Sequence, residues 1–119
     1  MNLVIMDDDK ALLRSLEILL VSRGHVVRSF HNPLEACSAL QGGLPPDVLL
    51  LDFMMPELNA PEFLGRIGRQ LPPTCKVILI SGHTDLIEPL NLGAMGISAF
   101  LPKPLDFDRL CELVDEKTG

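Results

Sequence analysis

The segment Asp47-Val-Leu-Leu-Leu-Asp52-Phe-Met-Met-Pro56 decides the fold class. Its branched aliphatic residues, 48–51, stand between the Pro45-Pro46 pair and Pro56. An apolar run of this length between prolines predicts a short strand that is buried on both faces, as in the middle of a parallel sheet. The strand ends in the carboxylate of Asp52, and open parallel sheets bind ligands at the carboxyl ends of their strands. Asp52 could equally cap the loop that follows, so the other strands must decide its role.

Strand and helix patterns alternate along the rest of the chain. Further strands are expected over residues 3–6, 25–30, 77–80 and 98–101, and the mixed character of 25–30 is typical of a sheet edge. Apolar residues at helical spacing predict helices over residues 10–23, 33–42, 60–71 and 86–92 and a last one after Asp106. This alternation predicts an α/β fold of five strand–helix units, a (βα)5 doubly wound parallel sheet with helices on both faces. The pattern alone leaves the strand order open.

Polar and small residues indicate where these helices begin and end. Asp9, Asn32 and Asp106 are placed to cap the first, second and last helices. The third helix would bury Phe63, Leu64 and Ile67, and Gly65 and Gly68 weaken it. The last helix would bury Phe107, Leu110, Cys111 and Val114. Pro89 and Gly93 predict that the fourth helix is short.

Composition restricts the classes of protein to which the chain belongs. Its 119 residues fit one domain over 1–119. A net charge of −6 without a Lys/Arg run argues against direct nucleic-acid binding. Cys37, Cys75 and Cys111 lack metal-type spacing and are interpreted as reduced core thiols of a cytoplasmic protein. No apolar run reaches the ~18 residues of a membrane span, and the N-terminus does not resemble a secretory signal.

Charged and polar groups follow four of the predicted strands. Asp7-Asp8-Asp9 follows the first strand, Asp52 the third, Ser81 the fourth and Lys103 the fifth. Parallel strands bring these ends to one edge, where clustered carboxylates need a cation because like charges resist ionising together. Hard oxygen ligands suit Mg²⁺, which shares its shell with phosphate. Asp52 could then be a nucleophile toward a phosphoryl group, with Lys103 balancing charge and the Ser81 hydroxyl donating a hydrogen bond.

Each of these residues also has a simpler interpretation. Asp9 is better explained as a helix cap, Ser81 could be a turn serine before Gly82, and Lys103 could be a surface lysine between prolines. Taken singly, these interpretations suffice. Four groups at four strand ends together indicate a site.

The motifs resemble those of the receiver domains of two-component response regulators, over essentially the whole chain. The family's acidic pair corresponds to Asp7 and Asp8, and its phosphoacceptor to Asp52 in Asp52-Phe-Met-Met-Pro56. Its hydroxyl residue corresponds to Ser81 in Ile80-Ser-Gly-His-Thr-Asp85, and its lysine to Lys103 in Phe100-Leu-Pro-Lys-Pro104. The resemblance implies the flavodoxin-like three-layer sandwich with strand order 2-1-3-4-5.

The resemblance also implies further roles. The Met54 carbonyl would join Asp7, Asp8 and Asp52 as an Mg²⁺ ligand, and the peptide between Lys103 and Pro104 would be cis, at the modest cost that prolines allow. Phe100 corresponds to the aromatic switch position, which turns inward when Ser81 is drawn to the phosphoryl group.

The resemblance implies partners as well. A histidine kinase or phosphotransfer protein would phosphorylate Asp52, and the fourth helix, fifth strand and last helix would form the output face. Phosphorylation-linked dimerisation is a further implication. Such a domain catalyses its own modification and turns over no separate metabolite, so it is not an enzyme in the usual sense.

Some residues depart from the family pattern. Ala60 stands where many relatives have glycine, which predicts a differently shaped turn. Met54 and His83 occupy positions beside the phosphorylation site where side chains govern the access of hydrolytic water. The bulky, apolar Met54 predicts a long-lived phosphoaspartate.

Two other functions would use some of the same residues. A haloacid-dehalogenase-type phosphatase would use Asp7 as nucleophile and Asp9 as acid/base, but the chain lacks a cap domain and an acidic pair after Lys103. A receiver that acts as a docking module without phosphorylation is disfavoured by the intact site residues. Residues 117–119 close the sequence, so a stand-alone receiver and one cut from a longer regulator or hybrid kinase both stay open.

Overall fold

A computed structural model describes residues 1–82, 85 and 91–116 of the chain. His83 lies outside these ranges, as does most of the helix expected over residues 86–92.

Five parallel strands form one sheet in the order β2-β1-β3-β4-β5. The strands are β1 (Asn2–Met6), β2 (Val26–Phe30), β3 (Val48–Asp52), β4 (Lys76–Ser81) and β5 (Ala99–Pro102). This order places β2 at an edge, as its mixed sequence predicted, and β3 at the centre. The predicted (βα)5 fold class and the 2-1-3-4-5 order are both confirmed.

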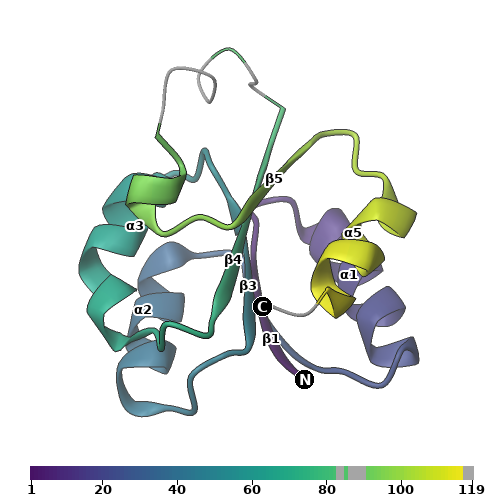
Figure 1. Cartoon of the computed structure of the whole chain (residues 1–119), viewed down its shortest axis with the longest axis horizontal. Helices are drawn as coiled ribbons and strands as arrows, with labels where there is room; N and C mark the ends of the chain where they lie inside the picture. Colours follow the sequence, from purple (N-terminus) through teal and green to yellow (C-terminus); the bar gives the residue numbers. More distant parts are fainter. Residues whose placement is uncertain (83–84, 86–90, 117–119) are drawn as a thin grey trace.

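Helices cover both faces of the sheet. Helices α1 (Lys10–Ser22) and α5 (Phe107–Asp115) lie on one side, and α2 (Pro33–Gly42) and α3 (Ala60–Ile67) on the other (Figure 1). Short 3-10 turns occupy Gly68–Gln70 and Gly93–Met95. No helix in the described ranges has the length and apolar character that crossing a bilayer requires.

The central strand contributes to two separate cores, one on each face of the sheet. Every residue of β3 is buried. Leu49 and Leu51 pack into the core beneath α2 and α3, and Val48 and Leu50 into the core beneath α1 and α5. Successive strand residues point to opposite faces, so an uninterrupted apolar run is what a doubly covered strand requires. Asp52 is thereby fixed at the end of a rigid segment.

The predicted caps are present. The Asp9 carboxylate accepts hydrogen bonds from the Ala11 and Leu12 amides, Asn32 caps α2, and Asp106 caps α5 through the Arg109 amide. Each side chain satisfies amides that the first turn of a helix leaves unpaired.

Two predictions about helices were wrong in detail. Helix α3 ends at Ile67 and continues only as a 3-10 turn, whereas a helix to Leu71 was expected; Gly68, a poor helix former, stands at the break. Phe107 is 42 % exposed, although it was assigned to the core. It is the first residue of α5, and helical side chains lean toward the N-terminus, so its ring extends past the start of the helix.

Candidate functional site

The strand register brings the predicted site residues to one edge of the sheet. Met6 pairs with Leu51, Asp52 with Ile80 and Ser81 with Pro102. Asp7 directly follows β1, so it emerges beside Asp52 at the end of the neighbouring strand. We call this end of the sheet the carboxyl edge.

Three carboxylates gather at the carboxyl edge. Asp7 is fully buried, Asp52 is 5 % exposed and Asp8 is exposed. One carboxylate oxygen from each lies within 4.8 Å of the others, a grouping that could hold a metal ion. The Asp9 amide donates to Asp7 Oδ1 at 2.9 Å, which orients that carboxylate. Asp9 itself is engaged as the α1 cap, as its simpler interpretation predicted.

Lys103 supplies the positive charge of this cluster. Its Nζ lies 2.9 Å from Asp7 Oδ2 as an ion pair, and it donates to Asp52 Oδ2 at 3.4 Å. The Lys103 amide donates to the Ser81 carbonyl at 2.8 Å, and the Lys103–Pro104 peptide is cis. Burial favours the neutral amine, but the hydrogen bond to Asp7 and the charge of Asp52 outweigh it, so the pKa of Lys103 is raised.

The environment of Asp52 strongly changes the acidity of its carboxyl group. Burial, and next the negative charge of Asp7, raise the pKa of Asp52 to about 7, with Lys103 opposing both. The ionised form of Asp52 therefore needs more positive charge than Lys103 alone provides. Three hard carboxylate oxygens that can meet at one point fit Mg²⁺.

The loop after Asp52 is closed by backbone hydrogen bonds. The Phe53 amide donates to the Ile80 carbonyl at 2.9 Å, and the Ala60 amide donates to the Phe53 carbonyl at 3.0 Å. Ala60, the residue that departs from the family pattern, is buried as the first residue of α3. Met54 is 47 % exposed at the start of this loop.

A capping box holds the far end of the same loop. The Glu62 amide donates to Asn59 Oδ1 at 2.9 Å, and the Asn59 amide donates to Glu62 Oε1 at 3.0 Å. Each side chain thus satisfies the other's backbone, which fixes the start of α3.

The two predicted switch residues lie on neighbouring strands. Ser81 ends β4 and is 1 % exposed. Phe100, in β5, is partly buried and packs against the core beneath α2 and α3. The structure thus gathers Asp7, Asp8, Asp52 and Lys103, and it places Ser81 at the end of the strand next to Asp52.

Sequence reasoning missed one buried charged residue. Lys76 begins β4, at the opposite end of the sheet, and is 7 % exposed. A lysine just before an apolar run usually indicates a solvated strand start, so the sequence carries no signal for its burial.

Comparison with known proteins identifies the family. The profile of the response regulator receiver domain matches residues 3–115. The chain belongs to this family. Receiver domains function in two-component systems and are phosphoacceptors rather than classical enzymes, and they bind Mg²⁺ at an acidic pocket. Membership favours the receiver interpretation over the phosphatase alternative.

Similar full-length proteins are bacterial transcriptional regulators. The receiver is 33 % identical over 114 residues to the DNA-binding transcriptional regulator NtrC of Proteus hauseri. This alignment covers 96 % of this chain and 24 % of that protein. It is also 33 % identical over 117 residues to the transcriptional regulatory protein FixJ of Bradyrhizobium diazoefficiens, an alignment that covers 96 % of this chain and 55 % of FixJ. The chain therefore spans about a quarter of the NtrC relative and about half of FixJ.

Solved structures share the receiver fold. A CheY-like receiver domain from Methanospirillum hungatei superimposes with a TM-score of 0.86 at 24 % identity, over 95 % of this chain and 89 % of that one. The response regulator TrrA of Thermotoga maritima, solved in complex with Mg²⁺-BeF, gives a TM-score of 0.80 at 24 % identity, over 95 % of both chains.

Proposed function

We propose that this receiver domain is a phosphorylation-dependent switch, in which Asp52 accepts a phosphoryl group from a partner histidine kinase or phosphotransfer protein. One observation carries the proposal: Lys103 Nζ lies within reach of both Asp7 and Asp52, and the carboxylate of Asp8 approaches the same point. A buried nucleophile between a cation and further acidic ligands suits phosphoryl transfer, which depends on positioning and charge balance.

The proposed step uses the Asp52 carboxylate as the nucleophile. One Asp52 oxygen forms a bond to phosphorus while the bond between phosphorus and the donor imidazole nitrogen breaks, and the imidazole keeps that electron pair. Lys103, already paired with Asp52, would balance the charge on the phosphoryl oxygens. The Ser81 hydroxyl, at the end of the adjacent strand, would donate to one of those oxygens.

Asp7, Asp8, Asp52 and the Met54 carbonyl would hold Mg²⁺ at this edge. The bound ion would neutralise the clustered carboxylates and share its coordination shell with the phosphoryl oxygens. The fit rests on the three converging carboxylates.

The signal would leave the site through Ser81 and Phe100. Movement of Ser81 toward the phosphoryl group would let the Phe100 ring, now partly buried against the core, turn further inward. The output surface would include β5 and α5, together with the segment before β5, and would bind a linked output domain, a partner protein or a second receiver. The NtrC and FixJ relatives, which extend well beyond this region, support a linked output domain.

The lifetime of the phosphorylated state would depend on residues beside Asp52. Met54 is half exposed at the start of the loop, where its apolar side chain would shield the phosphoaspartate from water. His83 is proposed as the second such residue from its sequence position.

Intact-protein mass spectrometry after incubation with acetyl phosphate and Mg²⁺ tests the proposal. We expect wild-type protein to gain one phosphoryl group and Asp52→Asn to gain none. Asp108→Asn, at an exposed position in the first turn of α5, is the matched control and should be labelled like the wild type. Full labelling of Asp52→Asn would rule out Asp52 as the acceptor.

Two further measurements separate the alternatives. Steady turnover of a generic phosphoester would support a phosphatase instead. Addition of beryllofluoride and Mg²⁺ should shift the amide resonances of Ser81 and Phe100; no shift would support a phosphorylation-independent docking module.

A further inference from the structure

A buried lysine lies at the end of the sheet opposite to Asp52. Lys76 is the first residue of β4 and is 7 % exposed, and it forms no ion pair with any carboxylate in the described ranges. A buried ammonium group is costly unless its protons are accepted by polar partners. We call this end of the sheet the amino edge.

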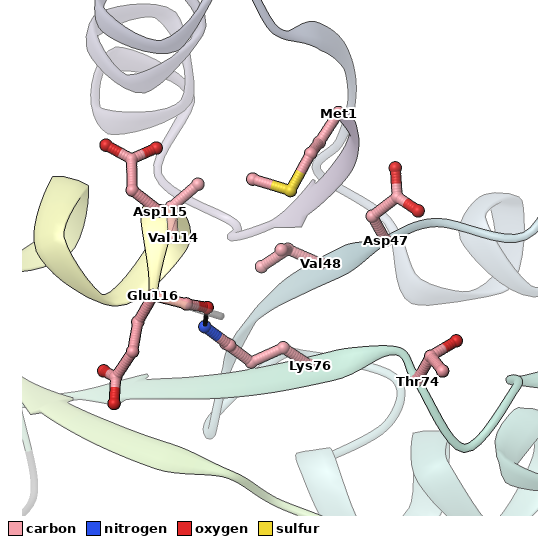
Figure 2. A pocket seen from close by; sticks show the side chains of 8 residues that line it. All are labelled: Met1, Asp47, Val48, Thr74, Lys76, Val114, Asp115 and Glu116. Carbon is pink, nitrogen blue, oxygen red and sulfur yellow. Dashed lines mark hydrogen bonds between the residues drawn. The ribbon is translucent and has the colours of Figure 1, made fainter. Parts of the chain in front are cut away.

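The partners of Lys76 are backbone carbonyls at the end of α5. Its Nζ donates to the Leu113 carbonyl at 2.6 Å and to the Glu116 carbonyl, and Figure 2 shows the second of these bonds. The last carbonyls of a helix have no partners within the helix, and they carry the negative end of its dipole. Lys76 therefore caps α5 from a strand.

The same helix end is held from a second side. Arg23 Nη2 lies 2.8 Å from Asp115 Oδ2, and His25 Nε2 lies 3.6 Å from Asp115 Oδ1. His25 Nδ1 in turn lies 3.3 Å from the amino group of Met1. The last turn of α5 is thus tied both to β4 and to the turn between α1 and β2.

Apolar packing acts at this end of α5 together with the polar contacts, because Leu113 and Val114 are buried in the core beneath α1 and α5. A hollow of about 360 Å³ is lined by residues from the strand starts and from the end of α5, among them Val48, Lys76, Val114 and Glu116 (Figure 2). Beside this hollow, the hydrogen bonds of Lys76 add to the packing of Leu113 and Val114 in holding the last turn on the sheet.

Strand β4 joins this helix end to the proposed phosphorylation site. Lys76 is its first residue and Ser81 its last, and all six residues are buried. At the rise of a parallel strand the two ends are about 17 Å apart. A buried strand that is paired on both sides is a stiff connection between them.

We propose that Lys76 is a positioning residue for signal output: its ammonium group fixes the last turn of α5, so that the position of this turn follows the state of β4. Glu116, the last residue that the structure describes, would therefore lie where the Lys76 contacts hold it. That Lys76 anchors the last turn of α5 follows from the geometry alone. That the position of this turn is coupled to Ser81 rests on the proposed function.

Amide hydrogen exchange tests the anchoring. In Lys76→Met, which keeps the length of the side chain without its charge, we expect the Glu116 amide to exchange about tenfold faster. That amide donates to the Glu112 carbonyl in the last turn. The Leu110 amide, which donates to Asp106 at the start of α5, should keep its wild-type rate.

Two further variants make the anchoring test specific. Arg109→Met removes an exposed cation of α5 that pairs with Glu112, and it should change the Glu116 rate little. If Lys76→Met does not fold, Lys76→Gln, which is uncharged and one atom shorter than lysine, should show the same faster exchange. Unchanged exchange at Glu116 in a folded Lys76 variant would overturn the anchoring.

Beryllofluoride with Mg²⁺ tests the coupling. We expect wild-type protein to show amide shifts at Ser81 and at Glu116, and Lys76→Met to show only the Ser81 shift. A Glu116 shift that persists in Lys76→Met, or that is absent from the wild type, would overturn the coupling. No Ser81 shift in the wild type would instead count against the proposed function, and the exchange comparison would still decide the anchoring.

Discussion

The two edges of the sheet use buried charge in opposite ways. At the carboxyl edge, Asp7, Asp8 and Asp52 converge and share one lysine, Lys103. At the amino edge, Lys76 has two carbonyl acceptors, and the exposed Asp115 pairs with Arg23. The first arrangement has an excess of negative charge that lowers stability, whereas in the second the buried ammonium group is satisfied by neutral carbonyls and the exposed charges are paired. A site that must accept a cation and a phosphoryl group tolerates such an excess, whereas a structural contact does not need one.

Of the substitutions that test this difference between the two edges, replacing Asp52 should have the largest effect. Asp52→Asn removes the nucleophile and should abolish phosphorylation completely. In Mg²⁺-free buffer it should also stabilise the fold at neutral pH and above by on the order of 2 kcal/mol, because it removes a buried carboxylate next to Asp7. Urea unfolding in the presence of a chelator measures this difference.

The sign of the pH dependence follows from the raised pKa of Asp52. In the unfolded chain the pKa lies near 4, and in the folded protein burial raises it to about 7. Burying the carboxylate lowers stability fully above about pH 7, and this penalty disappears as the pH falls toward about 4. The gain from Asp52→Asn should shrink over the same range, and a gain that does not depend on pH would contradict this origin.

Replacing Lys103 should have the next largest effect. Lys103→Met leaves the carboxylates without their cation and should lower the free energy of unfolding by about 1–2 kcal/mol at neutral pH in Mg²⁺-free buffer. The loss should diminish in mildly acidic buffer, where Asp52, with its raised pKa, takes up a proton. Lys76→Met is the matched comparison: no carboxylate in the described part of the chain pairs with Lys76, so its effect should not follow pH over that range.

Replacing Met54 should have a smaller effect than replacing Asp52 or Lys103, and it should change the rate at which the phosphoaspartate is hydrolysed. Met54→Asn should hydrolyse its phosphoaspartate several-fold faster than the wild type, because a polar side chain admits and orients water where methionine excludes it. Decay of the phosphorylated mass after removal of the donor measures this rate. Glu57→Gln, also exposed in the same loop, is the control. An unchanged rate in Met54→Asn would show that Met54 is not the shield.

The smallest effect is expected at the exposed pair of the amino edge. The hydrogen bond from Arg23 lowers the pKa of Asp115, so the pair stabilises the fold above the unfolded-state pKa and loses that contribution as the pH falls through the lowered value. Asp115→Asn should lower Tm at neutral pH by no more than about 3 °C, and the difference should vanish in strongly acidic buffer. Thermal unfolding at both pH values checks this. A larger decrease in Tm would mean that the Arg23–Asp115 pair stabilises the fold more than exposed ion pairs usually do.

The sequence predicted the carboxyl edge better than the amino edge for a physical reason. Apolar runs such as residues 48–51 define strands, and parallel strands must bring their ends together, so the convergence of Asp7, Asp52 and Lys103 follows from pattern and topology. The contacts of Lys76 depend on where the end of α5 lies above the sheet, and no local pattern encodes that position.

The helix errors have related causes. Phe107 fits the apolar stripe of α5 by spacing, but spacing does not show that the sheet no longer covers the first turn. The end of α3 at Ile67 reflects a competition between weak helix formers and packing, which apolar periodicity alone does not resolve.

The closed loop after Asp52 has a consequence for how receivers of this kind diversify. Its shape is held by the Phe53 and Ala60 backbone and by the Asn59–Glu62 box, none of which involves the half-exposed side chain at position 54. Mutation can therefore exchange that side chain freely while Asp52 stays in place. How long a signal lasts and whether it is received at all are thus open to separate selection.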